Sequence, residues 1–292
     1  MNLINQLHNL GFSGTLYFHV LGEPLLHPSV FKITDHAADA GMRPVIFTNG
    51  GSLTDTNIHR ILASKTSEIV ISMQTINQES YERLRKTPFG WETYLHRIQT
   101  ALGAANSRSN ENDCIFRVSI GLKKADPEHP EDVFFLEHES LSHVKQSIAE
   151  IFSAVPRADL ESAFSELDTH GLVGMGTLHV TDMLHLSVKP MGNWRRAWRD
   201  KPVTEGRCAF FGTEMAALSN GDITFCHIDY DGRTAIGNIT EKPLAEIIDT
   251  PEVMRMVEEF TAGRAIARGC ERCKGVKDTP LGLGGIPCRG LQ

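Results

Sequence analysis

The residues with the clearest chemistry are four cysteines in the last third of the chain: Cys208, Cys226, Cys270 and Cys273. Two residues separate Cys270 from Cys273, a spacing that lets both thiolates bind one metal. Asn220-Gly221-Asp222 predicts a turn, so its flanks should pair as a hairpin that ends at Cys226. With Cys208, the hairpin would complete a four-thiolate shell. These residues alone leave open a structural zinc site and an iron–sulfur cluster.

The remaining two cysteines do not fit this set. Cys114 lies on a predicted strand far from the others, and we expect it to be a buried apolar side chain. Cys288 could be a substitute ligand, but we expect it to take no part in metal binding. The clustering of the other cysteines favours metal binding over disulfides in a reducing compartment.

A second group of chemically useful residues follows a predicted strand near the start of the chain. The run Tyr17–Val20 continues into Leu21-Gly22-Glu23-Pro24. Glycine lets a ligand approach the backbone, and glutamate places a carboxylate at the carboxyl end of a strand, where barrel enzymes have their sites. Proline fixes the turn into the next helix. By themselves these residues are equally consistent with a tight turn and a solvated glutamate.

Three segments together resemble the core of radical S-adenosylmethionine (SAM) enzymes: LGEPLLHP, FTNGGSLT and VISMQTINQESYERLR. The resemblance implies that the first segment binds the methionyl amine of SAM, that the second ends the next strand, and that the third offers polar groups to the SAM ribose and carboxylate. The residues concerned are, in that order, Gly22, Glu23 and Pro24; Thr48, Asn49 and Gly50; Ser72 and Gln74. Ser72 is equally consistent with a hydroxyl satisfied within the sheet. Arg85 matches the end of the third segment, but we expect it to lie on the surface.

The sequence departs from that family in one respect. Radical SAM enzymes carry a Cys-x3-Cys-x2-Cys loop whose thiolates hold a 4Fe–4S cluster with one iron open to SAM. No such triplet occurs in this sequence. We therefore expect no SAM cleavage by the chain as given. We also expect that a first strand and the triplet are missing from it, through a wrongly assigned start codon or a fragmentary gene.

The cysteine-rich region is similar to the SPASM/twitch domains of radical SAM enzymes, which hold auxiliary 4Fe–4S clusters. The resemblance rests on CAFFGTEMAALSNGDITFCHIDYDGRTAIGNITEKPLAEI and the later CERC. It implies one auxiliary cluster, held by the four cysteines named above, because the further cysteines of the two-cluster version are absent. The resemblance also favours an iron–sulfur cluster over a zinc ion at this site. His227 and Asp229 could tune the cluster or meet substrate, although a hairpin surface explains them equally well.

The pattern of secondary structure that positions these groups predicts an α/β fold. Short β-rich runs alternate with amphipathic helical patterns and short links, which favours a parallel sheet with right-handed crossovers. The predicted strands are Thr15–Val20, Pro44–Thr48, Glu68–Gln74, Ile115–Gly121 and Leu184–Lys189. We therefore predict a partial (β/α)6 TIM-like barrel that lacks its first strand, followed by a small iron–sulfur domain.

The helical patterns have recognisable starts and ends. His27-Pro28-Ser29 begins one helix, and Thr54 and Asn77 can cap two more. Leu244 to Phe260 reads as one helix. Near the start, Leu3, Leu7 and Leu10 trace a helical stripe ahead of the first predicted strand, which predicts that the chain begins inside a βα unit. We place the domain boundary near residue 200, which gives an incomplete radical SAM core over 1–200 and an auxiliary cluster domain over 201–292.

The composition and charge of the chain argue against some classes of binding partner. The net charge of −7 disfavours nonspecific binding to nucleic acid or to an anionic membrane surface. No apolar run approaches the roughly 20 residues that span a bilayer, and the N-terminus is not that of a signal peptide. We therefore expect a cytoplasmic protein with no nucleic-acid or membrane partner.

The combined prediction is a radical SAM oxidoreductase or modifying enzyme that is inactive as this chain. The resemblance implies a peptide or small-molecule substrate and an electron donor such as flavodoxin or ferredoxin. Two alternatives remain: a non-catalytic binding module, and a zinc-stabilised structural protein. The residues that choose a substrate lie in loops with no transferable code.

Overall fold

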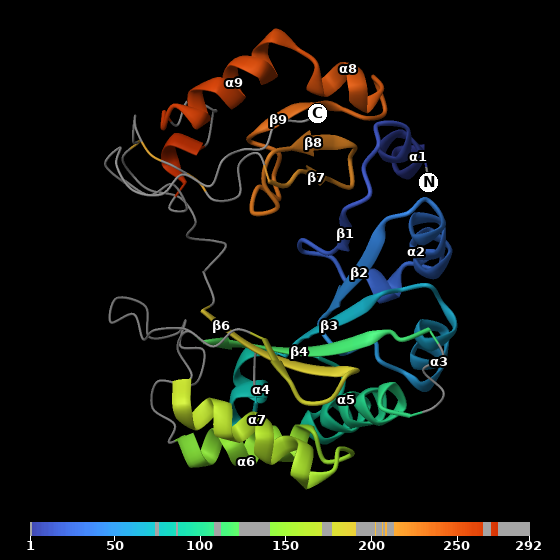
Figure 1. Cartoon of the computed structure of the whole chain (residues 1–292), viewed down its shortest axis with the longest axis vertical. Helices are drawn as coiled ribbons and strands as arrows, with labels where there is room; N and C mark the ends of the chain where they lie inside the picture. Colours follow the sequence, from blue (N-terminus) through green and yellow to red (C-terminus); the bar gives the residue numbers. More distant parts are fainter. Residues whose placement is uncertain are drawn as a thin grey trace. The chain divides into compact units, whose positions relative to one another are not determined.

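The computed structural model describes residues 2–73, 76–85, 87–107, 112–122, 141–170, 177–190, 202, 206, 208, 213–264 and 270–273. The chain divides into two compact units (Figure 1). The sheet unit is Ser13–Met191. The cysteine unit combines Met1–Phe12 with Gly192–Gln292. The N-terminal residues are therefore grouped with the C-terminal ones, which differs from the predicted division at residue 200.

The sheet unit is built on a six-stranded sheet with the order β1-β2-β3-β4-β6-β5. Its strands are β1 (Thr15–Phe18), β2 (Arg43–Thr48), β3 (Glu68–Ser72), β4 (Ile115–Leu122), β5 (Thr177–His179) and β6 (Leu184–Pro190). Every neighbouring pair is parallel except β5 and β6. The carboxyl ends of β1, β2, β3, β4 and β6 consequently lie along one edge, where ligand sites of parallel sheets form.

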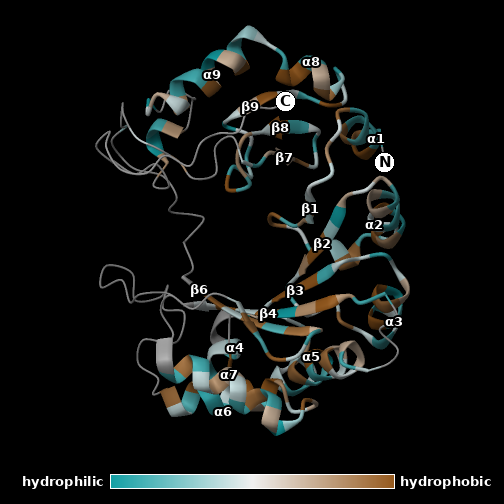
Figure 2. Cartoon of the chain, viewed as in Figure 1, coloured by the Kyte–Doolittle hydropathy of each residue, from teal (hydrophilic) through white to brown (hydrophobic). Residues whose placement is uncertain are grey.

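Helices line one face of this sheet (Figure 1). They are η1 (Pro24–Leu26), α2 (Val30–Asp39), α3 (Asp55–Ala63), α4 (Gln78–Leu84), α5 (Trp91–Ala105), α6 (Leu141–Ile151) and α7 (Arg157–His170). Apolar and polar residues alternate along α3 and α5, whereas β2 and β3 are largely apolar (Figure 2). One continuous core results, with Ile46, Ile71 and Phe116 fully buried between sheet and helices.

A charged group lies on the sheet near the amino ends of β3 and β4. Glu68 is 3% exposed and pairs with Arg43 and Arg117, the former at 2.5 Å between Oε2 and the guanidinium. Arg117 also donates to Thr177 Oγ1 at 3.4 Å. On the next strands the rings of His179 and His185 meet edge to face at 4.1 Å. Two cations on one carboxylate offset the cost of burying it.

The cysteine unit is smaller. It contains α1 (Asn2–Asn9), a three-stranded antiparallel sheet of β7 (Ala216–Ala217), β8 (Asp222–Thr224) and β9 (Ala235–Asn238), then α8 (Leu244–Ile248), α9 (Pro251–Thr261) and η4 (Cys270–Arg272). Gly221 closes the β7–β8 hairpin with φ +92°, a left-handed conformation that favours glycine. Gly237 lets β9 approach α8, because a Cβ there would lie 2.9 Å from the Ile247 side chain.

Helix α1 packs within the cysteine unit and not as a crossover helix of the sheet. Leu3 and Leu7 pack against the cluster of Ile223, Leu244 and Ile247. Gln6 Oε1 accepts a hydrogen bond from Leu244 N at 2.6 Å, which satisfies an amide at the start of α8. The expectation that this helix belongs to a βα unit is wrong, because its apolar stripe covers α8.

The predicted parallel α/β architecture is confirmed, as are the five predicted strands and the caps at Thr54 and Asn77, whose side chains accept from Asn57 N and Ser80 N. Among the elements that were not predicted are β5 and α7. The single helix predicted over Leu244 to Phe260 is wrong: it is interrupted because Thr250 caps a new helix with Pro251 at its first position. Among the described residues, no helix is both long enough and apolar enough to cross a bilayer.

His185 gives the sheet unit a specific response to acid. Burial, and then His179, lowers the pKa of His185 below 6.5. The unfolded chain therefore binds this proton more readily, so stability is present above pH ~6.5 and falls as pH drops through the lowered pKa. We expect His185→Gln to reduce the loss of unfolding free energy below that pH by up to about 1.4 kcal/mol per pH unit. Urea unfolding from pH 7.5 to 5 measures this, and an unchanged slope would contradict it.

Candidate functional site

Glu23 links the ends of two neighbouring strands. The chain leaves β1, passes Val20 at φ +86° and reaches Glu23, which caps η1 by accepting from Leu25 N at 3.2 Å. The other carboxylate oxygen accepts from Asn49 N at 2.7 Å, just beyond β2. Pro24 begins η1, where its fixed φ suits the first helical position. The half-buried carboxylate is thus held at the carboxyl edge of the sheet by two backbone amides.

Gly22 has open space beside its own backbone. A Cβ added at Gly22 would meet nothing within 4 Å, and the residue is exposed. Packing within the protein therefore does not require glycine here. A ligand could approach this backbone closely, as the predicted SAM-binding role demands.

The Thr48-Asn49-Gly50 segment forms a tight turn whose side chains are used internally. Thr48 Oγ1 accepts from Gly50 N at 3.1 Å, and Asn49 Oδ1 accepts from Gly51 N at 2.8 Å. Gly50 has φ +82°, and a Cβ there would lie 3.1 Å from the Tyr94 ring. These residues therefore shape the strand end, and the Asn49 backbone is also bonded within the protein, to Glu23, Arg85 and Tyr94.

Arg85 joins the ends of β2 and β3. It donates to Asn49 O and to Ser72 O, both at 2.9 Å, and its guanidinium lies 4.8 Å from the centre of the Tyr94 ring. Tyr94 donates to the same Asn49 carbonyl at 3.0 Å, and burial raises its pKa to about 12, so it stays protonated. The expectation of a surface arginine is wrong, because one planar guanidinium reaches two carbonyls at this edge.

Ser72 belongs to a row of hydroxyl groups that crosses the sheet. The register pairs Ser72 of β3 with Ser119 of β4, Ser119 with Ser187 of β6, and Ser187 with Thr177 of β5. Ser187 is 1% exposed, and its hydroxyl finds no hydrogen-bond partner in the described part of the chain. Sequence reasoning missed all but Ser72, although polar residues at every second position of β4 and β6 were the available signal. Gln74 lies outside the described residues.

The four predicted metal-binding cysteines gather in the cysteine unit. Cys226 follows β8, while Cys270 and Cys273 share the turn of η4, where Cys273 N donates to Cys270 O at 3.0 Å. Cys208, Cys270 and Cys273 pack against the apolar cluster that contains Phe225 and Phe260. None of the described cysteines forms a disulfide. The hairpin end and the Cys-x2-Cys turn are thus on one apolar base.

The electrostatics of these thiols fit a metal-binding shell. Burial raises the pKa of Cys226 to about 11, partly offset by the Ile228 amide, and neighbouring Cys208 and Cys273 raise it further. Burial and the other three thiols likewise raise the pKa of Cys270. Thiols that disfavour each other's ionisation this way need a cation to become thiolates together. The donor set therefore suits an iron–sulfur cluster or zinc. Cys114, by contrast, is fully buried in the sheet unit, as predicted.

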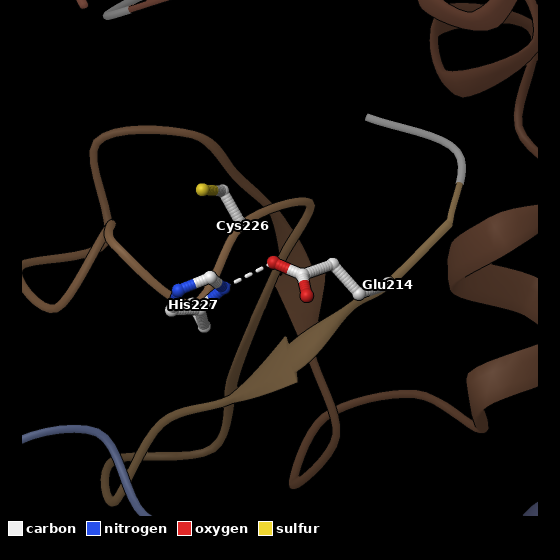
Figure 3. A group of neighbouring side chains, drawn as sticks. All are labelled: Glu214, Cys226 and His227. Carbon is white, nitrogen blue, oxygen red and sulfur yellow. Dashed lines mark hydrogen bonds and ion pairs between the residues drawn. The ribbon is translucent and has the colours of Figure 1, made fainter. Parts of the chain in front are cut away.

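His227 and Glu214 lie beside Cys226 (Figure 3). His227 Nδ1 contacts Glu214 Oε1, and both side chains are about three-quarters buried, with exposures of 24% and 29%. Asp229 is 2% exposed and accepts from Arg233 N, Thr234 N and Thr234 Oγ1. Asp229 therefore fixes the loop after Cys226, which is a structural role. Glu214 was not singled out from the sequence.

Comparison with known proteins identifies the class of the cysteine-rich segment. Residues 208–274 match the SPASM family, described as an iron–sulfur cluster-binding domain. This segment is therefore a SPASM-type domain, and it contains all four gathered cysteines.

The chain as a whole is similar to the AdoMet-dependent heme synthase of Methanosarcina barkeri, with 26% identity over 253 residues, or 82% of this chain and 69% of that protein. This confirms the predicted resemblance to SAM-dependent enzymes with an iron–sulfur domain. Among solved structures, anSMEcpe with bound AdoMet has 13% identity and a TM-score of 0.49 over 97% of this chain and 78% of its own. Streptococcus suis SuiB bound to the precursor peptide SuiA has 12% identity and a TM-score of 0.48 over 92% and 62%.

Arg85 should contribute measurably to the stability of the sheet unit. Arg85→Met removes two charge-assisted hydrogen bonds to carbonyls, and we expect the free energy of unfolding to fall by about 1.5–3 kcal/mol. Arg157→Met is the control, since Arg157 is exposed on α7 and should change stability by less than about 0.5 kcal/mol. Urea unfolding of both variants measures the difference, and equal stabilities would show that Arg85 holds nothing in place.

Proposed function

We propose that this protein is a radical SAM-type chain whose sheet unit binds SAM and whose cysteine unit holds one auxiliary 4Fe–4S cluster. The observation that carries the proposal is the gathering of Cys208, Cys226, Cys270 and Cys273 within a SPASM-type segment. When bound, such a cluster supplies one-electron transfer or an iron that binds substrate. The chain's own contribution is four thiolates on an apolar base, which keeps water from the sulfurs.

The SAM site is proposed at the carboxyl edge of β1, β2 and β3. Its residues are Gly22, Glu23, Pro24, Thr48, Asn49, Gly50, Ser72 and Gln74. Glu23 would bind the positively charged amino group of SAM, because its carboxylate retains acceptor capacity beyond the two amides it already binds. Ser72 and Gln74 would supply polar groups to the ribose and carboxylate.

The reaction of the complete enzyme would begin with reductive cleavage of SAM and hydrogen abstraction from substrate. This sequence contains no Cys-x3-Cys-x2-Cys motif, so we expect the chain alone to bind SAM without cleaving it. The relatives support a peptide or small-molecule substrate, since SuiB is known bound to a precursor peptide and the Methanosarcina barkeri protein is a heme synthase. An electron donor such as flavodoxin or ferredoxin and a cytoplasmic location belong to the same proposal.

The cluster is tested by anaerobic reconstitution followed by iron and sulfide quantitation. We expect about four irons and four sulfides per chain for the wild type. Alanine at Cys226, Cys270 or Cys273 should abolish or strongly reduce this content. Cys114→Ala is the matched control, because Cys114 is buried in the other unit and should not alter iron content. One zinc and no iron in the wild type would contradict the cluster proposal.

SAM binding is tested separately by calorimetry on the cluster-free chain. Glu23→Gln keeps the shape of the side chain but removes its charge, so it should weaken SAM binding by about tenfold, the loss of one charge-assisted hydrogen bond. Glu161→Gln on α7 is the control, because Glu161 is exposed and far along the chain from the site. Equal affinity of wild type and Glu23→Gln would place SAM elsewhere.

A further inference from the structure

We propose that Glu214, Cys226 and His227 form a second metal site, suited to a zinc ion, which overlaps the cluster site at Cys226. The Cys226 sulfur, one nitrogen of His227 and one carboxylate oxygen of Glu214 lie within 4.8 Å of one another (Figure 3). The inference concerns these three residues and does not depend on the auxiliary cluster being present.

The hairpin brings the three ligands together. The antiparallel register pairs Ala216 with Thr224 and Ala217 with Ile223. Continued outward by two residues, it brings Glu214 opposite Cys226, at the open end of the hairpin. Glu214 therefore reaches across to the same point as Cys226 and the following His227.

The loop after Cys226 is fixed before any metal binds. Thr224 Oγ1 donates to Cys226 O at 3.1 Å, and Asp229 N donates to the same carbonyl at 3.2 Å. The buried Asp229 carboxylate accepts three hydrogen bonds from Arg233 and Thr234. A fixed loop reduces the entropy lost when Cys226 and His227 bind one ion.

The ligand types select zinc over an iron–sulfur cluster at this spot. Thiolate, imidazole and carboxylate are the three ligands that zinc accepts, and three protein ligands plus water form its usual open site. A thiolate and a carboxylate also neutralise a divalent ion, whereas four thiolates would leave two negative charges. Glu214 and His227 are partly exposed, so water can reach the fourth position.

Because both sites use Cys226, the zinc ion and the iron–sulfur cluster cannot be bound at the same time. A zinc ion held by Cys226 withdraws one thiolate from the four-cysteine shell, so zinc should block assembly of the cluster. The Glu214–His227 pair would thereby add a zinc site that competes with the cluster for Cys226.

Cobalt and zinc titrations of the reduced, cluster-free full chain test the site. Cobalt should give one equivalent with a thiolate charge-transfer intensity typical of a single sulfur. His227→Gln and Glu214→Gln should each weaken zinc binding by about 10- to 100-fold. Cys273→Ala should leave it unchanged, because Cys273 belongs only to the four-thiolate shell. Circular dichroism confirms that each variant is folded.

The opposite pattern would overturn the inference. If Cys273→Ala abolishes zinc binding while His227→Gln and Glu214→Gln do not weaken it, zinc occupies the four-thiolate shell. Absence of zinc binding by the wild type would also overturn it. Cluster reconstitution of His227→Gln and Glu214→Gln separates the two proposals: both variants should take up iron as the wild type does, with less inhibition by zinc. A wild type that takes up no iron would refute the cluster while leaving the zinc result intact.

Discussion

The backbone of Asn49 is the point on which the candidate SAM site depends, because contacts from three strand ends meet at it. Its N–H donates to the carboxylate of Glu23, after β1, and its C=O accepts from Arg85 and Tyr94. The N–H and the C=O belong to the two peptide groups on either side of the Asn49 Cα, so these contacts hold the residue from both sides. Since Arg85 also holds Ser72 O, the spacing from Glu23 to Ser72 is set by backbone geometry.

The parallel sheet was predictable because its strands are apolar runs bounded by turn residues, and the caps at Thr54 and Asn77 have local causes. The role of Arg85 was not predictable, because its partners, Asn49 and Ser72, come from other elements. The docking of α1 was hidden for the same reason, as its partner α8 lies more than two hundred residues away. The break before Pro251 could have been predicted from the sequence, because proline indicates the start of a new helix. The prediction of one helix gave more weight to the apolar stripe that continues on both sides of the proline.

The cysteine unit brings its four candidate ligand cysteines together with little regular structure. Its strands have two to four residues, and α8 packs closely on β9 because Gly237 carries no side chain. The cysteines were recognisable from spacing alone, but Glu214 was not, because its position opposite Cys226 depends on hairpin register. Sequence spacing therefore identifies ligands on one segment better than ligands delivered across a turn.

In the sequence, the sheet unit is inserted between the two segments of the cysteine unit, and this determines an order of events during synthesis. The ribosome makes α1 before the sheet unit and α8 after it, with every residue of the sheet unit between them. Domains fold as units while the chain emerges. The sheet unit can therefore fold first, whereas Leu3 and Leu7 can pack only after α8 has been made. The cysteine unit is consequently completed only after the sheet unit, so its thiols encounter cellular metals when the sheet unit is already folded.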